Sequence, residues 1–214
     1  MLLEAIKLNK SYERNRVIQD ASISIDKGDS VCIIGENGSG KSTLLKIFCG
    51  LIKPDKGNLK VLNADPFKHP DNLIIKQRIG VLLHSNMLYP VLTLKENLTF
   101  FSKLLGIVDF KTNVDKVASK LNLENFLNTE VYKLSNGNQR KAGFAKSILN
   151  DPEILITDEP EANIDHQSTE IFSLIFKERS QRLKANVFTS HSESFYNSCS
   201  NKKLGLSSGR LSPL

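Results

Sequence analysis

The chain reads Gly35-Glu36-Asn37-Gly38-Ser39-Gly40-Lys41-Ser42 directly after the short apolar run Val31–Ile34, and Thr43–Cys49 follows with the composition of a helix. This satisfies the phosphate-loop pattern, in which glycines let the backbone wrap closely around phosphate groups. Backbone N–H groups and a helix N-terminus then face the anion. Lys41 is expected to reach the β- and γ-phosphates and the Ser42 hydroxyl to bind Mg²⁺. The predicted nucleotide-binding residues are Gly35, Asn37, Gly38, Ser39, Gly40, Lys41, Ser42 and Thr43.

Other apolar runs place further polar groups at the ends of predicted strands. Ile154–Ile156 and Val187–Phe188 are short and continuously apolar, and each ends in polar residues. Strands buried on both faces have this composition, which is typical of a parallel sheet. Leu3–Leu8 and Ala21–Ile25 instead alternate apolar and polar residues, as half-exposed antiparallel strands do. We therefore expect an α/β fold: a phosphate-loop NTPase core with a parallel sheet, and an N-terminal antiparallel β-subdomain.

The middle of the chain predicts helices. Thr93-Leu94-Lys95-Glu96 fits a capping box, and apolar residues then recur at helical spacing in residues 98–105 and 114–121. We expect an inserted α-helical subdomain at roughly residues 93–150. The 214 residues suffice for one sizeable core and leave little room for a second domain of ordinary size. Residues 1–214 are therefore expected to form a single domain.

Composition excludes several classes of protein. Hydrophobic residues make up 40 % of the chain, which excludes low-complexity disorder. No apolar run approaches the ~18 residues of a bilayer span, and Met1–Glu4 lacks the pattern of a signal peptide. The three cysteines are too scattered for a disulfide framework or a zinc site, which favours a reducing intracellular compartment. The net charge of +6 comes from dispersed basic residues, and we expect no nucleic-acid partner.

A pair of carboxylates follows the predicted strand Ile154–Ile156. In a phosphate-loop protein, a carboxylate at the end of a nearby parallel strand holds Mg²⁺, and Asp158 suits this role. Glu159 then projects toward the γ-phosphate, where it could orient an attacking water or accept its proton. An Asp-Glu pair alone is more often a solvated loop. The upstream phosphate loop favours the functional interpretation.

The segment Leu134-Ser135-Asn136-Gly137-Asn138 comes shortly before this pair. With the motifs above, it makes the chain resemble the nucleotide-binding subunit of ATP-binding cassette (ABC) transporters over essentially its whole length. The resemblance implies a head-to-tail dimer with two ATP molecules at the interface. Ser135 and Gly137 of one subunit would contact the γ-phosphate held by the other. Ser135 can also cap the helix that follows, which presents an anion-binding helix N-terminus, and an ordinary cap is the alternative.

Further positions carry over from this resemblance one at a time. Tyr12 lies where the family places an aromatic side chain that stacks on adenine. Asp165 resembles the anchor of the loop that crosses the dimer interface, and would contact ATP in trans. His191 resembles the switch histidine, which hydrogen-bonds the γ-phosphate and helps hold the attacking water. The predicted catalytic residues are thus Glu159 and His191.

The sequence also departs from the family pattern. His84 stands where the family normally has a glutamine that touches Mg²⁺ and senses the membrane domain. Because Mg²⁺ prefers oxygen ligands, we expect His84 to keep the sensing role and to contact the metal only through water. Ser42, Asp158 and His84 make up the predicted metal site. Asn136, Asn138 and Glu161 also replace common family residues, and Glu161 is expected to alter the nearby interface.

The resemblance implies Mg²⁺-dependent ATP hydrolysis at two composite sites, coupled to dimer closure. The expected partners are a polytopic membrane permease subunit and a second ABC ATPase subunit, in a homodimer or heterodimer. The chain would then be cytoplasmic and peripheral on the inner face of a membrane. Residues 84–97 are the expected docking surface. Met87, Leu88 and Tyr89 fit either a short helix of the membrane partner or the core of the helical subdomain.

The run Leu88–Leu98 resembles export-type members of the family, and the whole chain also resembles the small ATPase of haem export in cytochrome c maturation. A soluble cassette ATPase of translation or DNA repair is the alternative function. Such proteins usually carry two cassettes or a long coiled-coil insertion, and this sequence has neither. A GTPase would need an Asn-Lys-x-Asp motif late in the chain, whereas Asn9-Lys10 precedes the phosphate loop.

Overall fold

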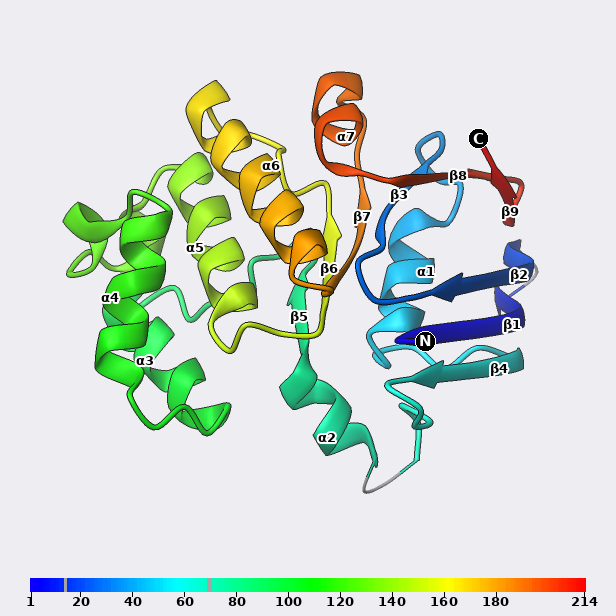
Figure 1. Ribbon diagram of the computed structural model, residues 1–214, viewed down its shortest axis with the longest axis horizontal. Coiled ribbons are helices and arrows are strands. Elements are labelled where there is room, and N and C mark those ends of the chain that lie inside the picture. The colour runs from blue at the N-terminus through cyan, green and yellow to red at the C-terminus, as the bar shows by residue number, and fades with distance from the viewer. Residues whose placement is uncertain (14, 69–70) are drawn as a thin grey trace.

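Nine strands form two sheets in the computed structural model, which describes residues 1–13, 15–68 and 71–214 (Figure 1). The smaller sheet is antiparallel, in the order β2 (Asn15–Ile25), β1 (Leu3–Tyr12) and β4 (Lys56–Val61). The larger sheet is parallel except at one edge, where β8 and β9 pair antiparallel. Its order is β5 (Ile79–Leu82), β6 (Ile154–Asp158), β7 (Ala185–Thr189), β3 (Ser30–Ile34), β8 (Lys202–Ser207) and β9 (Arg210–Pro213).

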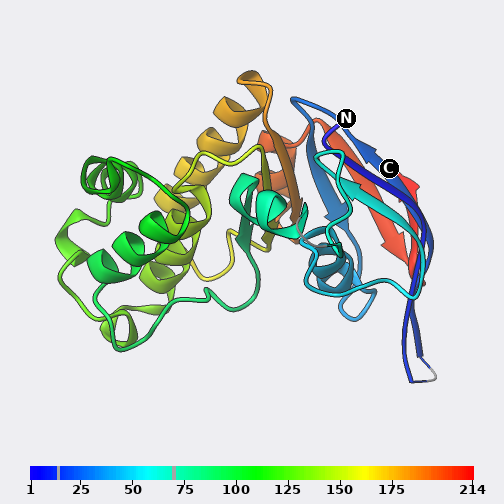
Figure 2. The same cartoon turned by 90° about the horizontal axis from the view of Figure 1, so that it is seen from below.

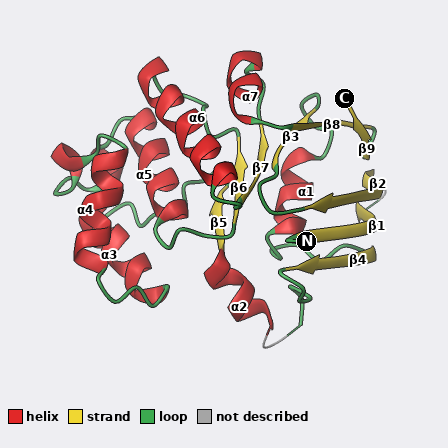
Figure 3. Ribbon diagram, viewed as in Figure 1, coloured by secondary structure: helices red, strands yellow, loops and turns green. Residues whose placement is uncertain are grey.

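Helices cover the larger sheet, and Figure 3 separates them from the strands by colour. The helices are α1 (Lys41–Phe48), α2 (Asp71–Arg78), α3 (Leu94–Leu104), α4 (Phe110–Lys120), α5 (Asn136–Ile148), α6 (His166–Gln181) and α7 (Glu193–Cys199), with short 3-10 turns η1 (Glu124–Phe126) and η2 (Val131–Lys133). In both Figure 1 and Figure 2, α3, α4 and α5 lie at the end of the molecule away from the antiparallel sheet. Within the described part of the chain, no helix combines the length and the apolar character that crossing a membrane requires.

Burial follows the sequence pattern. All five residues of β6 and all five of β7 are buried, as expected for the centre of a parallel sheet covered on both faces. In β1, Leu3, Ala5 and Leu8 are buried while intervening residues are exposed or half-buried. The predicted α/β fold with an antiparallel β-subdomain and a helical subdomain is confirmed. β4, β8 and β9 were not predicted, because they lie at or near sheet edges and bury few apolar side chains.

Two hydrophobic clusters stabilise the fold. One lies between the antiparallel sheet, α1 and the larger sheet, and includes Phe48. The other joins the larger sheet to α5, α6 and α7 through phenylalanine rings. Phe144 and Phe172 stack with ring centroids 3.9 Å apart, and Phe176 meets Phe188 edge-on at 4.9 Å. Rings in contact like these position α5 and α6 firmly on the strands that carry the site.

The predicted capping box at the start of α3 is present. The Thr93 hydroxyl accepts from the Glu96 backbone N–H at 3.2 Å, and a Glu96 carboxylate oxygen accepts from the Thr93 backbone N–H at 2.8 Å. These two bonds satisfy N–H groups that would otherwise lack partners at a helix N-terminus. The Glu96 carboxylate accepts hydrogen bonds from both the backbone N–H and the hydroxyl of Thr93, and these two bonds lower the pKa of Glu96.

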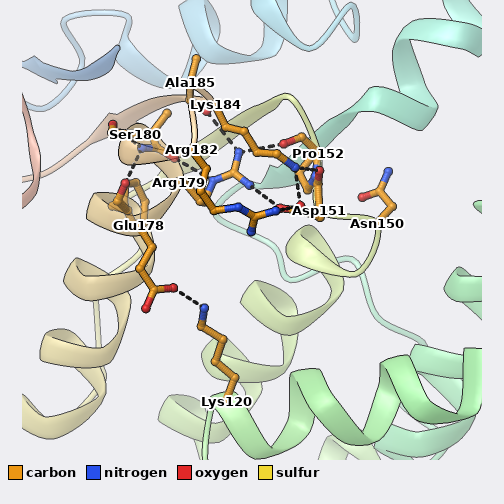
Figure 4. A network of polar contacts seen from close by, with 12 residues as sticks. Lys120, Asn150, Asp151, Pro152, Glu178, Arg179, Ser180, Arg182, Lys184 and Ala185 are labelled. Carbon is orange, nitrogen blue, oxygen red and sulfur yellow. Dashed lines mark hydrogen bonds and ion pairs between the residues drawn. The ribbon is translucent and has the colours of Figure 1, made fainter. Parts of the chain in front are cut away.

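Figure 4 shows a polar network that fixes α6 to the starts of β6 and β7. Asp151 pairs with Lys184 at 2.5 Å and with Arg182 at 2.8 Å. Arg179 is only 4 % exposed and donates to Asn186 Oδ1 at 2.9 Å and to the Pro152 carbonyl at 3.1 Å. Burial lowers the pKa of Arg179 to about 10, although the Asp151 charge opposes that shift. This end of the sheet is opposite the carboxyl ends of the strands. The network therefore fixes the position of α6 and does not contact the site.

Candidate functional site

Three adjacent strands of the larger sheet, β6, β7 and β3, end at the same edge. Their pairing is parallel, and the register places Asp158 of β6 beside Thr189 of β7, and Thr189 beside Ile33 of β3. The predicted phosphate loop follows β3, Glu159 follows β6 and His191 follows β7. Groups from distant parts of the sequence therefore meet at the carboxyl edge, where open α/β sheets bind ligands.

The loop at residues 35–40 leads into the N-terminus of α1. Gly40 precedes the helix with a φ of 104°, and an added Cβ would lie 2.8 Å from the carbonyl oxygen of Val17. A larger residue would fit neither this backbone conformation nor this space. No side chain caps the start of α1, so the first N–H groups of the helix remain available for an anion.

Two side chains of the loop are arranged for phosphate. Lys41 is buried, and its Nζ donates to the carbonyl oxygens of Gly35 at 2.7 Å and Glu36 at 3.0 Å. The Ser39 hydroxyl is buried and has no hydrogen-bond partner within the described residues. A buried hydroxyl without a partner is costly, and a phosphate oxygen would satisfy it. The loop residues thus fit a nucleotide phosphate.

Asp158 connects the loop to β7. Its Oδ2 accepts a hydrogen bond from the Ser42 hydroxyl at 2.6 Å, and its Oδ1 accepts one from the Thr189 hydroxyl at 2.6 Å. Asp158 is buried, so these two bonds fix its carboxylate in one orientation. The carboxylate therefore points at the start of α1.

Ser42 and Asp158 supply oxygen ligands of the kind that Mg²⁺ prefers. No group of three or more His, Cys, Asp or Glu side chains capable of holding a metal occurs in residues 1–13, 15–68 and 71–214. A two-ligand protein site nevertheless fits Mg²⁺, which usually keeps several waters and binds substrate phosphates as well.

Glu159 and His191 face each other above this pair. Glu159 Oε1 lies 3.2 Å from His191 Nε2, and the two side chains are 39 % and 48 % exposed. The Glu159 backbone has a φ of 47°, which is uncommon outside glycine. Its N–H donates to the Thr189 carbonyl at 3.2 Å and to the Thr189 hydroxyl at 3.0 Å. These bonds support the strained backbone and hold a carboxylate and an imidazole where both can reach water.

The remaining polar residues of the resemblance occupy helix starts. The Ser135 hydroxyl accepts from the Asn138 N–H at 3.2 Å and caps α5. Asp165 Oδ1 accepts from the Ser168 N–H at 2.8 Å and caps α6, and this bond lowers the pKa of Asp165. Both residues therefore have a structural role within the chain, and their contact with ATP of another subunit stays a prediction.

The loop between β6 and α6 lies against α5. An added Cβ at Gly137 would be 2.9 Å from the Asn163 carbonyl oxygen, so the start of α5 and this loop approach closely. Glu161 accepts a hydrogen bond from the buried Ser190 hydroxyl, next to His191. Burial raises the pKa of Glu161, although the bond from Ser190 opposes that shift. Through this hydrogen bond, Glu161 connects the loop after β6 to the segment that carries His191.

Other predicted site residues are less confined. Asn37 is exposed at the loop, and Thr43 is half-buried in α1. Tyr12 is exposed near the tip of the hairpin that β1 and β2 form, which projects from the body in Figure 2, and Lys10 Nζ lies 5.6 Å from its ring centroid. His84 follows β5 and its side chain is exposed. Adenine stacking by Tyr12 and metal contact by His84 remain predictions.

Two residues that the sequence did not indicate belong to the site. Thr189 holds Asp158 and Glu159, and Arg140 of α5 donates from Nη2 to the carbonyl oxygens of Glu159, at 2.8 Å, and Asp158. The only signal for Thr189 was its place at the end of a buried strand. Nothing in the sequence around Arg140 predicted its hydrogen bonds with the carbonyls of Asp158 and Glu159. The complete arrangement is that of a phosphate-loop nucleotide hydrolase.

Comparisons with known proteins agree with this class. The family model described as ABC transporter matches residues 18–162. NatA of Bacillus subtilis (strain 168), an ABC transporter ATP-binding protein, is 34 % identical over 179 residues, which are 82 % of this chain and 72 % of that protein. EgtV of Helicobacter pylori (strain G27), an ergothioneine transport ATP-binding protein, is 31 % identical over 195 residues, or 89 % of each chain.

A solved structure has the same fold. It is a dimeric ATP-binding cassette in a post-hydrolysis state bound to ADP and Pi, with a TM-score of 0.90 and 24 % identity, covering 98 % of this chain and 96 % of that one. The chain belongs to the ABC transporter family. It is an ATP-binding subunit that hydrolyses ATP, as predicted. The relatives described above are transport proteins, which agrees with this function and not with the alternative in translation or DNA repair.

Proposed function

We propose that the chain closes head to tail with a second cassette around two ATP molecules and drives export through a separate membrane permease. The observation that carries the hydrolytic part is the Glu159–His191 contact of 3.2 Å, directly beside the hydrogen bonds of Asp158 with Ser42 and Thr189. A base, its positioning partner and two oxygen ligands for Mg²⁺ would thus lie together at the carboxyl edge of the larger sheet.

Each side chain has one task in this mechanism. Lys41 exchanges its bonds with loop carbonyls for the β- and γ-phosphates, since a lysine ammonium is a mobile point charge. Ser42 and Asp158 would hold Mg²⁺, with His84 contacting it through water. The ion would neutralise charge on the phosphates. Glu159 orients the attacking water and accepts its proton, and His191 hydrogen-bonds the γ-phosphate.

The second subunit completes the site from across the interface. Ser135, Gly137 and Asp165 of that subunit contact the γ-phosphate side, whereas Tyr12 of the subunit that supplies the phosphate loop stacks on adenine. The start of α5 supports this assignment, because the Ser135 cap uses the Asn138 N–H and leaves the N–H groups of the preceding residues to an anion. ATP thereby makes contacts that exist only in the closed dimer, and their loss after hydrolysis reopens it.

The substitution Glu159→Gln tests this mechanism. The amide cannot accept the water proton, so we expect ATP hydrolysis to fall by at least roughly a hundredfold while ATP binding persists. With ATP and Mg²⁺ the variant should elute from gel filtration as a dimer. Glu153→Gln is the matched control, because Glu153 pairs with Arg78 at the far end of β6. Persisting hydrolysis by a variant that remains monomeric with ATP would contradict the role of Glu159.

A groove between the core and the helical subdomain is the proposed permease contact. It has a volume of 290 Å³ and an apolar lining that includes Met87, Phe101 and Leu104, with Lys146 at its side. For Met87, Leu88 and Tyr89 the sequence left open a permease contact or a place in the helical core, and Leu88 is buried in that core. Met87 and Tyr89 are half-exposed. An apolar face of a short permease helix would fill the groove.

We propose export as the direction of transport because the run Leu88–Leu98 resembles export-type members of the family. The narrower proposal of haem export depends on the resemblance to the haem-export ATPase, which often carries His at the position of His84, and the relatives compared above do not bear on it. In either case the ATPase would lie on the cytoplasmic face of a membrane, held there by its permease.

A further inference from the structure

Arg140 of α5 binds carbonyl oxygens of two separate segments of the chain. Its Nη1 donates to the Leu83 carbonyl at 2.7 Å and approaches that of His84 at 3.5 Å, in the segment after β5. Its Nη2 donates to the carbonyls of Glu159, at 2.8 Å, and Asp158, at the end of β6. One guanidinium therefore bridges the segment after β5 and the backbone of the hydrolytic carboxylate.

The surroundings of Arg140 suit a bridge better than an ion pair. No carboxylate forms a salt bridge with it in the described parts of the chain, and its Nε is buried without a hydrogen-bond partner. Burial lowers the pKa of Arg140, and the charges of Asp158, Glu161 and Glu159 oppose that shift. A cation that gives up hydration mainly for backbone carbonyls is costly to place. The hydrogen bonds to carbonyls of both segments compensate this cost, and so they favour the arrangement in which both segments reach the guanidinium.

The same face of α5 holds the segment after β5 over two further turns. An added Cβ at Gly143 would lie 2.8 Å from the Asn86 Cβ and 2.9 Å from a methyl group of Leu82. Lys146 Nζ donates to the Asn86 carbonyl at 3.1 Å. Residues three apart share a helix face, so Arg140, Gly143 and Lys146 form one continuous contact with residues 82–86. Arg140 stands at the end of this contact nearest Glu159.

We propose that Arg140 is a positioning residue that couples the backbone of residues 83–86 to the backbone of Glu159. A shift of the segment after β5 then moves the hydrolytic carboxylate through the guanidinium, without help from the exposed side chain at position 84. This inference rests on the proposed role of Glu159 in hydrolysis. It adds a mechanical link that begins next to Met87, a lining residue of the permease groove.

An arginine is required for this geometry. Its planar fork presents donors from two nitrogens to acceptors on opposite sides, whereas a lysine ammonium is a single point on a flexible stem. Lys at this position can hold one segment at a time. Met fills a similar volume and holds neither. Comparing Arg, Lys and Met at position 140 therefore distinguishes the effect of the bridge from the effects of charge and of side-chain volume.

The test compares Arg140→Met and Arg140→Lys with the wild-type subunit in steady-state ATP hydrolysis and in equilibrium ATP binding. We expect kcat to fall roughly ten- to hundredfold in Arg140→Met, since a misplacement of about 1 Å costs up to a hundredfold. ATP affinity should stay unchanged because the phosphate loop keeps its contacts. Arg140→Lys should recover only part of kcat. Arg182→Met is the matched control, as Arg182 is exposed and bonds Asp151 far from the site.

Amide hydrogen exchange distinguishes coupling from a local effect on Glu159. In Arg140→Met, exchange should accelerate in residues 83–86 and in residues 158–161 together. Wild-type kcat in Arg140→Met, or faster exchange in one segment alone, would overturn the proposal. So would a parallel loss of ATP affinity and melting temperature, which would mark Arg140 as a folding residue. Glu159→Gln in the same assay reports on the proposed function separately: if it keeps hydrolysing ATP, the assignment of Glu159 fails, whatever Arg140 does.

Discussion

The Thr189 hydroxyl serves two functional groups at once. It donates to Asp158 Oδ1 at 2.6 Å and accepts from the Glu159 N–H at 3.0 Å, so the carboxylate proposed for Mg²⁺ and the strained backbone of the proposed base depend on one side chain. The sequence pattern predicted Asp158 and Glu159 because the two carboxylates are consecutive residues directly after an apolar strand. It could not predict Thr189 or Arg140, because their partners are set by strand register and by how α5 packs.

Thr189→Val tests this dependence. Valine keeps the shape and loses the hydroxyl, which leaves Asp158 Oδ1 without its donor. Without this bond the Asp158 carboxylate and the Glu159 backbone lose a shared support, and since a misplacement of about 1 Å costs up to a hundredfold, kcat should fall by roughly ten- to hundredfold. Steady-state hydrolysis with saturating ATP and Mg²⁺ measures the effect, and Thr189→Ser should restore most of the rate. Wild-type kcat in Thr189→Val would show that the hydroxyl is dispensable.

At the scale of elements, the sequence predicted the strands and helices that are buried on one face or on both faces. Strands β3, β6 and β7 each contain a continuous apolar run and are almost fully buried because both faces are covered, and α3 begins with a capping box that the structure retains. Edge elements gave no such signal. In β4, the buried residues Leu59 and Val61 are surrounded by lysines, a glycine and an asparagine, since the rest of the strand faces water.

The attachment of α6 to β6 and β7 predicts a pH-dependent stability. Partial burial alone would raise the pKa of Asp151, but Lys184, Arg182 and Arg179 outweigh it and lower that pKa. A lowered carboxyl pKa stabilises the fold at pH values above the unfolded pKa of about 4, and the gain disappears as Asp151 is protonated at lower pH. Because the carboxylate is 48 % exposed, we expect Asp151→Asn to reduce the free energy of unfolding by only about 1 kcal/mol at pH 7.

Urea denaturation at pH 7 and at pH values below 4 would measure this difference. The gap between wild type and Asp151→Asn should narrow as the pH falls. Asp115→Asn, on the exposed face of α4, is the control and should change little at either pH. A gap that stays constant with pH would show that the Asp151 charge does not contribute.

At the scale of the whole molecule, the groove beside α3 is lined by residues of both the core and the helical subdomain. Its lining comes from the end of α1, from α2, β5, α3 and α5, and from Met87 in the segment after β5. Burial lowers the pKa of Lys146, beside the groove, to about 8. A permease helix in this position would touch the segment after β5 and the helical subdomain together, so its movement would reach the segment that Arg140 connects to Glu159.

Leu104→Glu tests the groove. Leu104 is 65 % exposed in the free subunit and lines the groove, so a glutamate there would be desolvated by the docked helix. We expect recovery with permease-containing vesicles to fall at least about tenfold, since burying an unpaired carboxylate costs more than the ~1.4 kcal/mol that a factor of ten requires. Val108→Glu is the control, because Val108 is 94 % exposed and lies outside the groove lining. Equal recovery of the two variants would exclude this groove as the contact.

The position of β3 between β7 and β8 has a consequence for how the chain is made. A ribosome delivers β3 and the phosphate loop early, yet both hydrogen-bonding neighbours of β3 come much later, beginning with Ala185. About 150 residues separate them, which at ~5–20 residues per second is on the order of ten to thirty seconds of synthesis. During that time a strand with the apolar run Val31–Ile34 stays without neighbours in its sheet. Unpaired strand edges of this kind are prone to aggregate, and the phosphate loop can reach its final position in the sheet only after β7 has been made.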